Sequence, residues 1–162
     1  NDDRYCAGDP NPDFYYGLNV KLSYKNWDFG FNGHGSLGYK VFNDFASNHS
    51  SSYFDVNAGN LPNFATAVKR TGFTQISSDY QFFSDFYLED ASFFRMDDIN
   101  LGYTFKNFRN WDGNIRVAAS CQNVFVLTKY SGIDPEINST DGVDRTFWPR
   151  PRTFSLRLNI NF

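Results

Sequence analysis

The fold is decided by ten residues near the end of the chain, Thr153-Phe154-Ser155-Leu156-Arg157-Leu158-Asn159-Ile160-Asn161-Phe162. Apolar and polar side chains alternate here without a break. Because successive side chains of a strand point to opposite faces, the stretch predicts a β-strand with one apolar and one polar face. Alternation alone fits a soluble β-sandwich as well as the wall of a transmembrane β-barrel.

Four more segments show the same period of two. In the first of them, Tyr16, Leu18 and Val20 alternate with Gly17 and Asn19. Short turns follow the first and third strands, and long loops follow the second and fourth. The sequence thus predicts an all-β fold whose five strands lie near 14–26, 27–42, 86–105, 115–127 and 152–162, with long loops near 43–85 and 128–151 and a possible short helix within 63–70.

The composition is that of a folded domain. The chain has 162 residues, of which 41% are hydrophobic and 20% aromatic, and this aromatic content excludes a disordered segment. No run of 18 apolar residues predicts a membrane-spanning helix. The formal net charge of −3 lacks the basic footprint of a nucleic-acid-binding protein, so we expect no nucleic-acid partner.

Three features favour an outer-membrane barrel over a soluble sandwich. Short turns alternate with long loops, aromatic residues recur near strand ends on the apolar face, and the strands reach the 9–11 residues or so that cross a bilayer. Bacterial single-chain barrels have an even number of strands, at least eight, and open sheet edges are costly in lipid. Five strands therefore predict an incomplete barrel that other strands must close.

Two other classes of protein remain as alternatives. One is a soluble, secreted β-sandwich that binds carbohydrate, in which two apolar faces would meet in a core. The other is an outer-membrane enzyme with a small barrel. That enzyme would need three further strands and a nucleophile beside a base.

Candidate catalytic and metal-binding residues are few. Asp28, His34 and Ser36 share one face of the second strand, but neighbours two residues apart lie about 6.6 Å from each other along a strand. We interpret them as polar residues that face the inside of the barrel, and we expect no enzyme activity. Acidic residues of the last loop offer oxygen ligands of the kind calcium takes, yet turn capping explains them better; they are Asp134, Glu136, Asp141 and Asp144.

The two cysteines, Cys6 and Cys121, form no metal-ligand motif and are too few for a disulfide framework. We therefore expect no metal and no cofactor. Aromatic residues in the long loops are candidates for contact with a ligand or a covering protein, although packing within the loops explains them equally well. The candidates are Tyr53, Phe64, Tyr80, Tyr130 and Trp148.

Several motifs, in the same order, resemble the SusC/RagA-type TonB-dependent transporters of the outer membrane. The resemblance covers nearly the whole chain, residues 1–162, as the C-terminal part of the receptor's β-barrel domain. The motifs are GDPNPDF at 8–14, DASFFR at 90–95, INLGY at 99–103, QNVF at 122–125, TKYSGIDPE at 128–136 and PRPRT at 149–153. One such motif would be weak support, whereas an ordered series is strong.

The resemblance implies a barrel of 22 strands that encloses a plug, located in the bacterial cell outer membrane. It implies import of oligosaccharides or oligopeptides, driven by the TonB complex through the plug, beneath a lid formed by a SusD-like surface lipoprotein. The further partners it implies are the remaining strands of the transporter and outer-membrane lipid. It also assigns the signal read by the barrel-assembly machinery to the last strand, at Phe154, Leu156, Leu158, Ile160 and Phe162.

Overall fold

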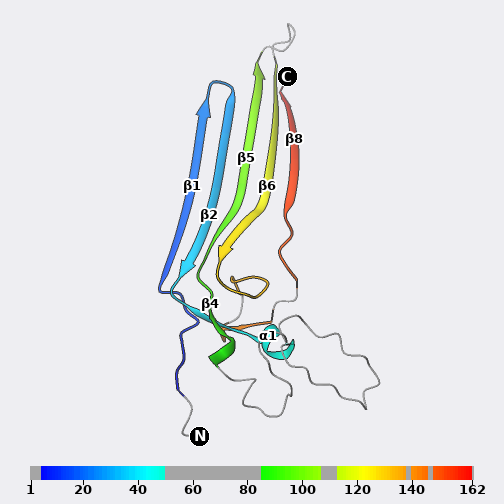
Figure 1. Ribbon diagram of the computed structural model, residues 1–162. Coiled ribbons are helices and arrows are strands. Elements are labelled where there is room, and N and C mark those ends of the chain that lie inside the picture. Colours follow the sequence, from blue (N-terminus) through cyan, green and yellow to red (C-terminus); the bar gives the residue numbers. More distant parts are fainter. Residues whose placement is uncertain (1–4, 50–84, 107–112, 138–139, 146–147, 162) are drawn as a thin grey trace, which may run out of the picture. The chain divides into compact units, whose positions relative to one another are not determined.

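The computed structural model describes residues 5–49, 85–106, 113–137, 140–145 and 148–161 (Figure 1). The chain divides into two compact units. The strand unit comprises Phe14–Leu37, Phe93–Thr128 and Arg150–Phe162. The loop unit comprises Asn1–Asp13, Gly38–Ser92 and Lys129–Pro149.

The strand unit is a five-stranded antiparallel sheet in the order β1-β2-β5-β6-β8. Each strand pairs with the next one along the chain that belongs to this sheet. The strands are β1 (Phe14–Tyr24), β2 (Trp27–Leu37), β5 (Phe93–Lys106), β6 (Asn114–Thr128) and β8 (Thr153–Asn161). The antiparallel all-β prediction is confirmed. As predicted, the sheet is an open piece and not a closed barrel.

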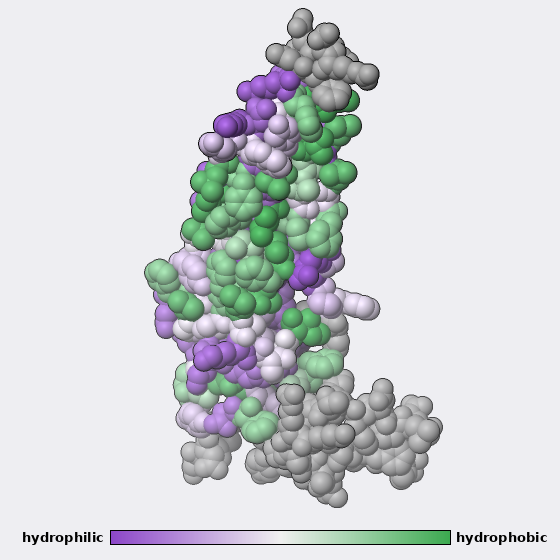
Figure 2. Space-filling model, turned by 45° about the horizontal axis from the view of Figure 1, so that its top comes forward, coloured by the Kyte–Doolittle hydropathy of each residue, from purple (hydrophilic) through white to green (hydrophobic). Residues whose placement is uncertain are grey.

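One face of this sheet is apolar and exposed. Leu22, Phe154 and Leu156 have exposed fractions of 58%, 74% and 79%. The hydrophobic side chains form a broad, continuous area (green in Figure 2). A soluble sandwich would bury such a face in its core, because burying apolar area is the main source of folding free energy. Within the strand unit, nothing described covers this face.

Aromatic side chains form two rows on the apolar face. The turn row lies beside the short β1–β2 connection, where the ring centroids of Trp27 and Tyr103, and of Tyr103 and Phe105, are 4.7 Å apart. The loop row lies near the other ends of the strands, with consecutive centroids 6.2, 6.1 and 6.4 Å apart; its members are Phe14, Tyr16, Phe94 and Phe125. Aromatic rows that border an apolar band are typical of transmembrane barrels.

A β-bulge at Asp97 changes which side chains of β5 face which way. Asn32 lies opposite Asp98, and Gly33 lies opposite Met96, so Asp97 has no counterpart in β2. An extra residue shifts the alternation by one. Beyond the bulge, Phe94 and Met96 therefore join the apolar face, whereas Phe93 and Arg95 join the polar face. The bulge explains why the alternation is blurred at Phe93-Phe94.

The structure corrects the predicted bounds of two strands. The strand expected near 27–42 ends at Leu37, because Gly38 adopts φ +77°, outside the strand region. Its last part is the separate strand β3 (Lys40–Asn43) of the loop unit. The strand expected near 86–105 begins only at Phe93, and the residues before it form other elements. These are the 3₁₀ helix η2 (Asp85–Tyr87) and the strand β4 (Leu88–Asp90).

The segments expected to be plain loops carry a second, smaller sheet. In the loop unit, β3 lies between β4 and β7 (Val143–Asp144), antiparallel to the first and parallel to the second. The helix α1 (Asp44–His49) follows β3. The buried apolar side chains of this unit include Tyr39, Val41, Tyr87, Ala91 and Tyr130. The helix considered within 63–70 lies outside the described residues.

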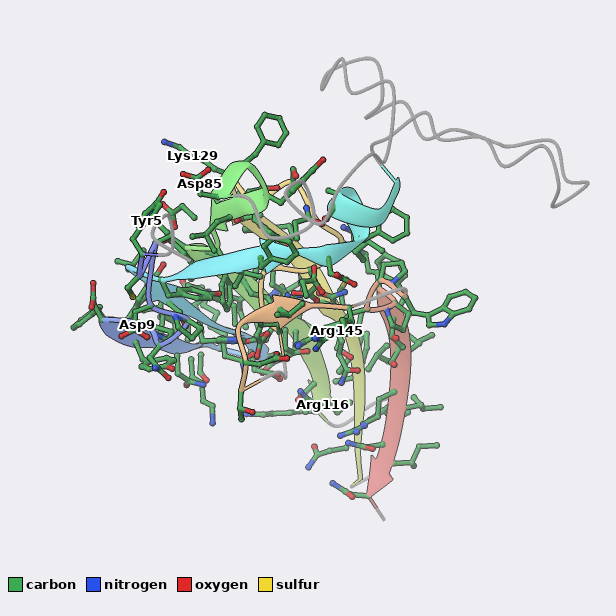
Figure 3. All side chains as sticks on the ribbon, turned by 90° about the horizontal axis from the view of Figure 1, so that it is seen from below. Tyr5, Asp9, Asp85, Arg116, Lys129 and Arg145 are labelled. Atoms are coloured by element: carbon green, nitrogen blue, oxygen red, sulfur yellow. The ribbon has the colours of Figure 1, made fainter. Side chains whose placement is uncertain are left out.

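The N-terminal segment is bound to this small sheet. The amide of Lys40 donates to the carbonyl oxygen of Asp9, at 2.9 Å. The hydroxyl of Tyr5 donates to Asp85 Oδ2, at 2.5 Å, and the two side chains lie together in Figure 3. Segments far apart in the sequence thus form one compact body. No helix in the described part of the chain is long and apolar enough to cross a membrane.

An ion pair on the polar face of the strand unit crosses the middle strand. Arg116 of β6 holds Asp28 of β2 through two hydrogen bonds, Nε to Oδ1 at 3.0 Å and Nη2 to Oδ2 at 2.5 Å. Gly102 of β5 lies between them, and a Cβ atom there would come within 2.6 Å of both side chains. The missing side chain of Gly102 therefore leaves the space through which the two charges meet.

We predict that Gly102→Ala breaks this ion pair, at a cost of about 1 kcal/mol relative to Gly17→Ala. Gly17 is the matched control, because it shares the polar face and its Cβ position is open. The measurement is the thermal unfolding of the full-length protein in detergent. In an Arg116→Met background the added cost should vanish, and an equal cost in both backgrounds would contradict the mechanism.

Candidate functional site

The polar face of the strand unit is a wall of hydrogen-bonding side chains. At the level of β1, β2 and β5 it contains a hollow of about 290 Å³, whose polar lining is Asn19, Lys21, Ser23, Asp28, Asn32, Asp98 and Asn100. Inside this lining, the amide of Asn100 donates to Asp98 Oδ1 at 3.2 Å. Such a surface binds water or a polar solute through many weak contacts. The lining also includes Phe29 and Phe31, which alternate with these polar residues along β2.

The three residues weighed as a hydrolytic triad are not assembled as one. Asp28 is held by Arg116, and His34 Nδ1 lies 2.7 Å from Asp97 Oδ2. In a triad a single carboxylate orients the histidine that activates the serine. Here Asp28, the carboxylate of the predicted triad, pairs with Arg116 instead of His34, and Ser36 is buried. These contacts give the residues structural roles on the polar face.

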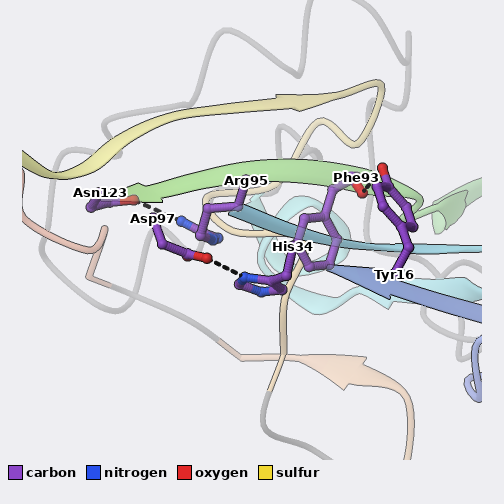
Figure 4. A network of polar contacts seen from close by, with 6 residues as sticks. All are labelled: Tyr16, His34, Phe93, Arg95, Asp97 and Asn123. Atoms are coloured by element: carbon purple, nitrogen blue, oxygen red, sulfur yellow. Dashed lines mark hydrogen bonds and ion pairs between the residues drawn. The ribbon is translucent and has the colours of Figure 1, made fainter. Parts of the chain in front are cut away.

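A polar network stabilises the bulge (Figure 4). On one side of β5, Asp97 binds His34 of β2, whose ring also packs edge-on against Phe93 at 5.5 Å between centroids. On the other side, Arg95 Nη1 donates to Asn123 Oδ1 at 2.8 Å. Arg95 is only 3% exposed, and its guanidinium lies 5.8 Å from the Phe93 ring centroid. The irregular point of the sheet is thus held from both neighbouring strands.

Asn123 connects three strands. Its backbone has φ 50°, the left-handed region that asparagine tolerates better than most residues. Its Nδ2 donates to the carbonyl oxygen of Arg150 at 2.7 Å, just before β8, and Arg152 Nε donates to its carbonyl oxygen at 3.4 Å. From the sequence, this asparagine was noted only as part of the QNVF motif. Its role depends on an irregularity in strand pairing that the sequence alone does not show.

A carboxylate organises the interior of the loop unit. Glu89 of β4 accepts hydrogen bonds from the backbone amide and the hydroxyl of Ser131, at 2.7 and 2.6 Å. It also accepts one from Asn43 Nδ2 of β3, at 3.1 Å. Asn43 is 1% exposed, so its bond to Glu89 satisfies a buried polar group, whereas Ser131 is exposed. The motif around Ser131 therefore fixes the shape of this unit.

Tyr130 lies inside the loop unit, with 5% of its surface exposed. Its hydroxyl donates to Asp144 Oδ2 at 2.7 Å. Burial, and then this hydrogen bond to the carboxylate, raise the pKa of Tyr130 well above its ordinary value. The residue was predicted as a contact for a ligand or a lid, and in this structure its side chain contacts the interior of the unit.

The other predicted contact residues fall into two groups. Trp148 is 84% exposed, and its role stays a prediction. Tyr53, Phe64 and Tyr80 lie outside the described residues, as does Phe162 of the predicted assembly signal. The remaining residues of that signal all lie on the exposed apolar face of β8; they are Phe154, Leu156, Leu158 and Ile160.

The acidic residues of the last loop have local partners. Asp134 Oδ1 accepts the amide of Glu136 at 2.9 Å, and Asp141 Oδ2 binds Arg145 Nη1 at 2.9 Å. Both contacts are those of turn residues and surface charge. Among the residues that the structure describes, no three potential ligands gather as a metal site would require.

The sequence is similar to known receptors along nearly all of its length. It is 39% identical over 169 residues to TonB-dependent receptor SusC of Bacteroides thetaiotaomicron, covering 99% of this chain and 16% of that protein. It is 32% identical over 180 residues to TonB-dependent receptor P3 of Formosa agariphila, covering 99% of this chain and 17% of that receptor. The chain therefore spans about one sixth of the length of these relatives. No protein-family model matches it.

Solved structures share the fold. The RagAB peptide importer in its closed-closed state superposes with a TM-score of 0.71 at 21% identity, covering 94% of this chain and 18% of that one. A second structure, of the RagAB peptide transporter, gives a TM-score of 0.68 at 22% identity, covering 90% and 17%. At this level of identity the likeness concerns the arrangement of the chain.

We predict that Asn123→Ala loosens the start of β8 more than Asn123→Gly does. Glycine keeps the left-handed backbone and loses only the side-chain bonds, whereas alanine also strains the backbone. Hydrogen exchange of the β8 amides should accelerate about tenfold in the alanine variant, since a lost hydrogen bond costs about 0.5–1.5 kcal/mol. Equal exchange in both variants and the wild type would contradict the assigned role.

We predict that Tyr130 does not ionise while the loop unit is folded. Because the folded unit raises its pKa, the neutral phenol contributes stability that is complete below about pH 10 and is lost as the pH rises further. The difference in absorbance near 295 nm between wild type and Tyr130→Phe should show one tyrosine absent from the group that titrates near pH 10. A Tyr130 that titrates with that group would contradict the prediction.

Proposed function

The chain is a segment of a SusC-like TonB-dependent receptor, and on that premise we propose that it forms part of the barrel wall of an outer-membrane importer. The cargo is a large nutrient, an oligosaccharide or an oligopeptide. A SusD-like surface lipoprotein covers the outer mouth, and the TonB complex acts through a plug supplied by another part of the polypeptide.

The exposed apolar face carries this proposal. β1 and β2 have 11 residues each and β8 has nine, lengths that suit tilted strands crossing a hydrocarbon core. The turn row and the loop row border that face, as aromatic girdles border the lipid band of a barrel. The opposite face is polar, which suits an aqueous interior.

The edges of the sheet support the proposal that further strands complete it. β1 and β8 each pair on one side only within the strand unit. In a bilayer, unpaired backbone amides and carbonyls at such an edge cost several kcal/mol each, so a spanning sheet must close on itself. We assign the missing neighbours of both strands to the remainder of the transporter.

The side of the membrane follows from the lengths of the connections. Barrels of this kind place short turns in the periplasm and long loops outside the cell. Lys25 and Asn26 alone connect β1 to β2, so the turn row lies on the periplasmic side. The long segments then face outward, where Trp148 is available to contact the lid or the cargo.

Transport without bond-breaking chemistry fits the contacts on the polar face. His34 and Asp28 are engaged in separate ion pairs, and the named relatives are receptors and importers. RagAB is named a peptide importer, but at 21% identity that likeness shows the fold alone, so both cargo classes stay in the proposal. A soluble carbohydrate-binding sandwich is less favoured, because it would leave this apolar face in water.

We predict that Leu158→Arg in the full-length transporter sharply reduces its amount in the outer membrane, whereas Asn159→Arg has a mild effect. Leu158 belongs to the apolar face, and an arginine near the middle of the bilayer costs about 2–4 kcal/mol. The adjacent Asn159 faces the polar side and is the matched control. The measurement is the amount of each variant in the outer-membrane fraction. Equal amounts of the two variants would contradict the assignment of the apolar and polar faces.

A further inference from the structure

The apolar face of the strand unit is not even: a groove follows β6. Over the middle of β6, the residues on this face are small; they are Val117, Ala119 and Cys121. Their cross-strand neighbours in β5 are Tyr103, Leu101 and Ile99, and those in β8 are Leu158, Leu156 and Phe154. Two rows of large side chains therefore flank a row of small ones over about 13 Å of strand.

The groove has a defined volume and an apolar lining. It encloses about 600 Å³, in the size range of small-molecule sites. Val117 and Ala119 form its floor, and Trp27, Tyr103, Phe105 and Leu156 are among its walls. Leu101 and Phe105 are 45% and 39% exposed, so the groove is open along the face that the proposed function places in lipid.

One end of the groove has groups that suit a lipid headgroup. It lies at the turn row, where the indole N–H of Trp27 and the hydroxyl of Tyr103 can donate hydrogen bonds at the membrane–water interface. Lys25, in the adjoining turn, is exposed, and its Nζ lies 5.2 Å from the centroid of the Tyr24 ring. Lys106 ends β5 at the same edge of the sheet and is also exposed. Lys25 and Lys106 thus put two cations at the edge of the sheet where the groove ends, which complements an anionic headgroup joined to an acyl chain.

We propose that this groove is a specific binding site for one anionic glycerophospholipid of the periplasmic leaflet. One acyl chain lies along β6 over Val117 and Ala119, and the phosphate lies at the turn row near Lys25. The inference rests on the proposed function, because it requires the apolar face to be in a membrane. It goes beyond that function because it distinguishes one specifically bound lipid from the lipids that surround any barrel.

The test measures lipid retention by the full-length transporter. The detergent-purified protein is titrated with phosphatidylglycerol, and bound lipid is counted by native mass spectrometry. Ala119→Phe fills the floor of the groove and should lower the bound fraction at least fivefold. Val20→Phe adds the same ring to the apolar face of β1, outside the groove, and should leave retention unchanged. Equal retention in the two variants would overturn the site.

A second variant tests the headgroup. Lys25→Gln should remove most of the preference for phosphatidylglycerol over phosphatidylethanolamine and leave the acyl chain seated. An unchanged preference would overturn the assignment of the phosphate to this turn. The substitution lies in an exposed turn, so it leaves the packing of the strands intact.

A measurement on the wild type covers the case in which Ala119→Phe fails to assemble. A cryo-electron microscopy map of the transporter in phosphatidylglycerol nanodiscs should show chain-shaped density between Tyr103 and Leu156. Protein covering the groove there, or only diffuse density as around the rest of the barrel, would overturn the proposal. Failure of the groove alone leaves the effect of Leu158→Arg on membrane yield intact, whereas failure of the proposed function removes that effect as well.

Discussion

The structure depends on one constraint: backbone amides and carbonyls in an apolar environment must be paired within the protein. A sheet meets that constraint along its interior strands, where most residues of β2 and β5 and residues 114–122 of β6 have partners on both sides. The alternation of side chains follows, because a strand paired on both sides can still place lipid against one face and water against the other. The proposed membrane setting therefore accounts for the exposure of Phe154, Leu156 and Leu158 of β8.

The strands could be predicted from the sequence because their pattern is local. Alternation over Tyr16–Tyr24 and Phe154–Ile160 sets both the type of element and the face of each residue. The break at Gly38 was harder to predict, because Tyr39 and Val41 continue the same alternation while belonging to the loop unit. Gly38 differs from the strand residues before it only in its positive φ. Several glycines precede it in the same strand, so its identity alone does not predict that conformation.

The contacts that organise the site were not predictable in the same way. Asp97 meets His34, and Arg95 meets Asn123, only after three strands have taken their register, and the register depends on the bulge itself. Tyr130 looked like any exposed loop aromatic until the partner of its hydroxyl, 14 residues away, was known. Sequence patterns predict local features such as the alternation of a strand well. They predict poorly the contacts of polar side chains whose partners lie on other strands.

The bulge has a consequence for how the sheet can close. The three strands differ in residue number across the bulge. β2 passes directly from Asn32 to Gly33, β5 has the extra residue Asp97, and β6 has two extra residues, Asn123 and Val124. β6 therefore carries two more residues than β2 across the bulge, and β5 carries one more. Such offsets add to the stagger between strands, and stagger together with strand number sets the tilt and diameter of a barrel. The extra residues of β5 and β6 thus contribute part of the shear of the complete barrel.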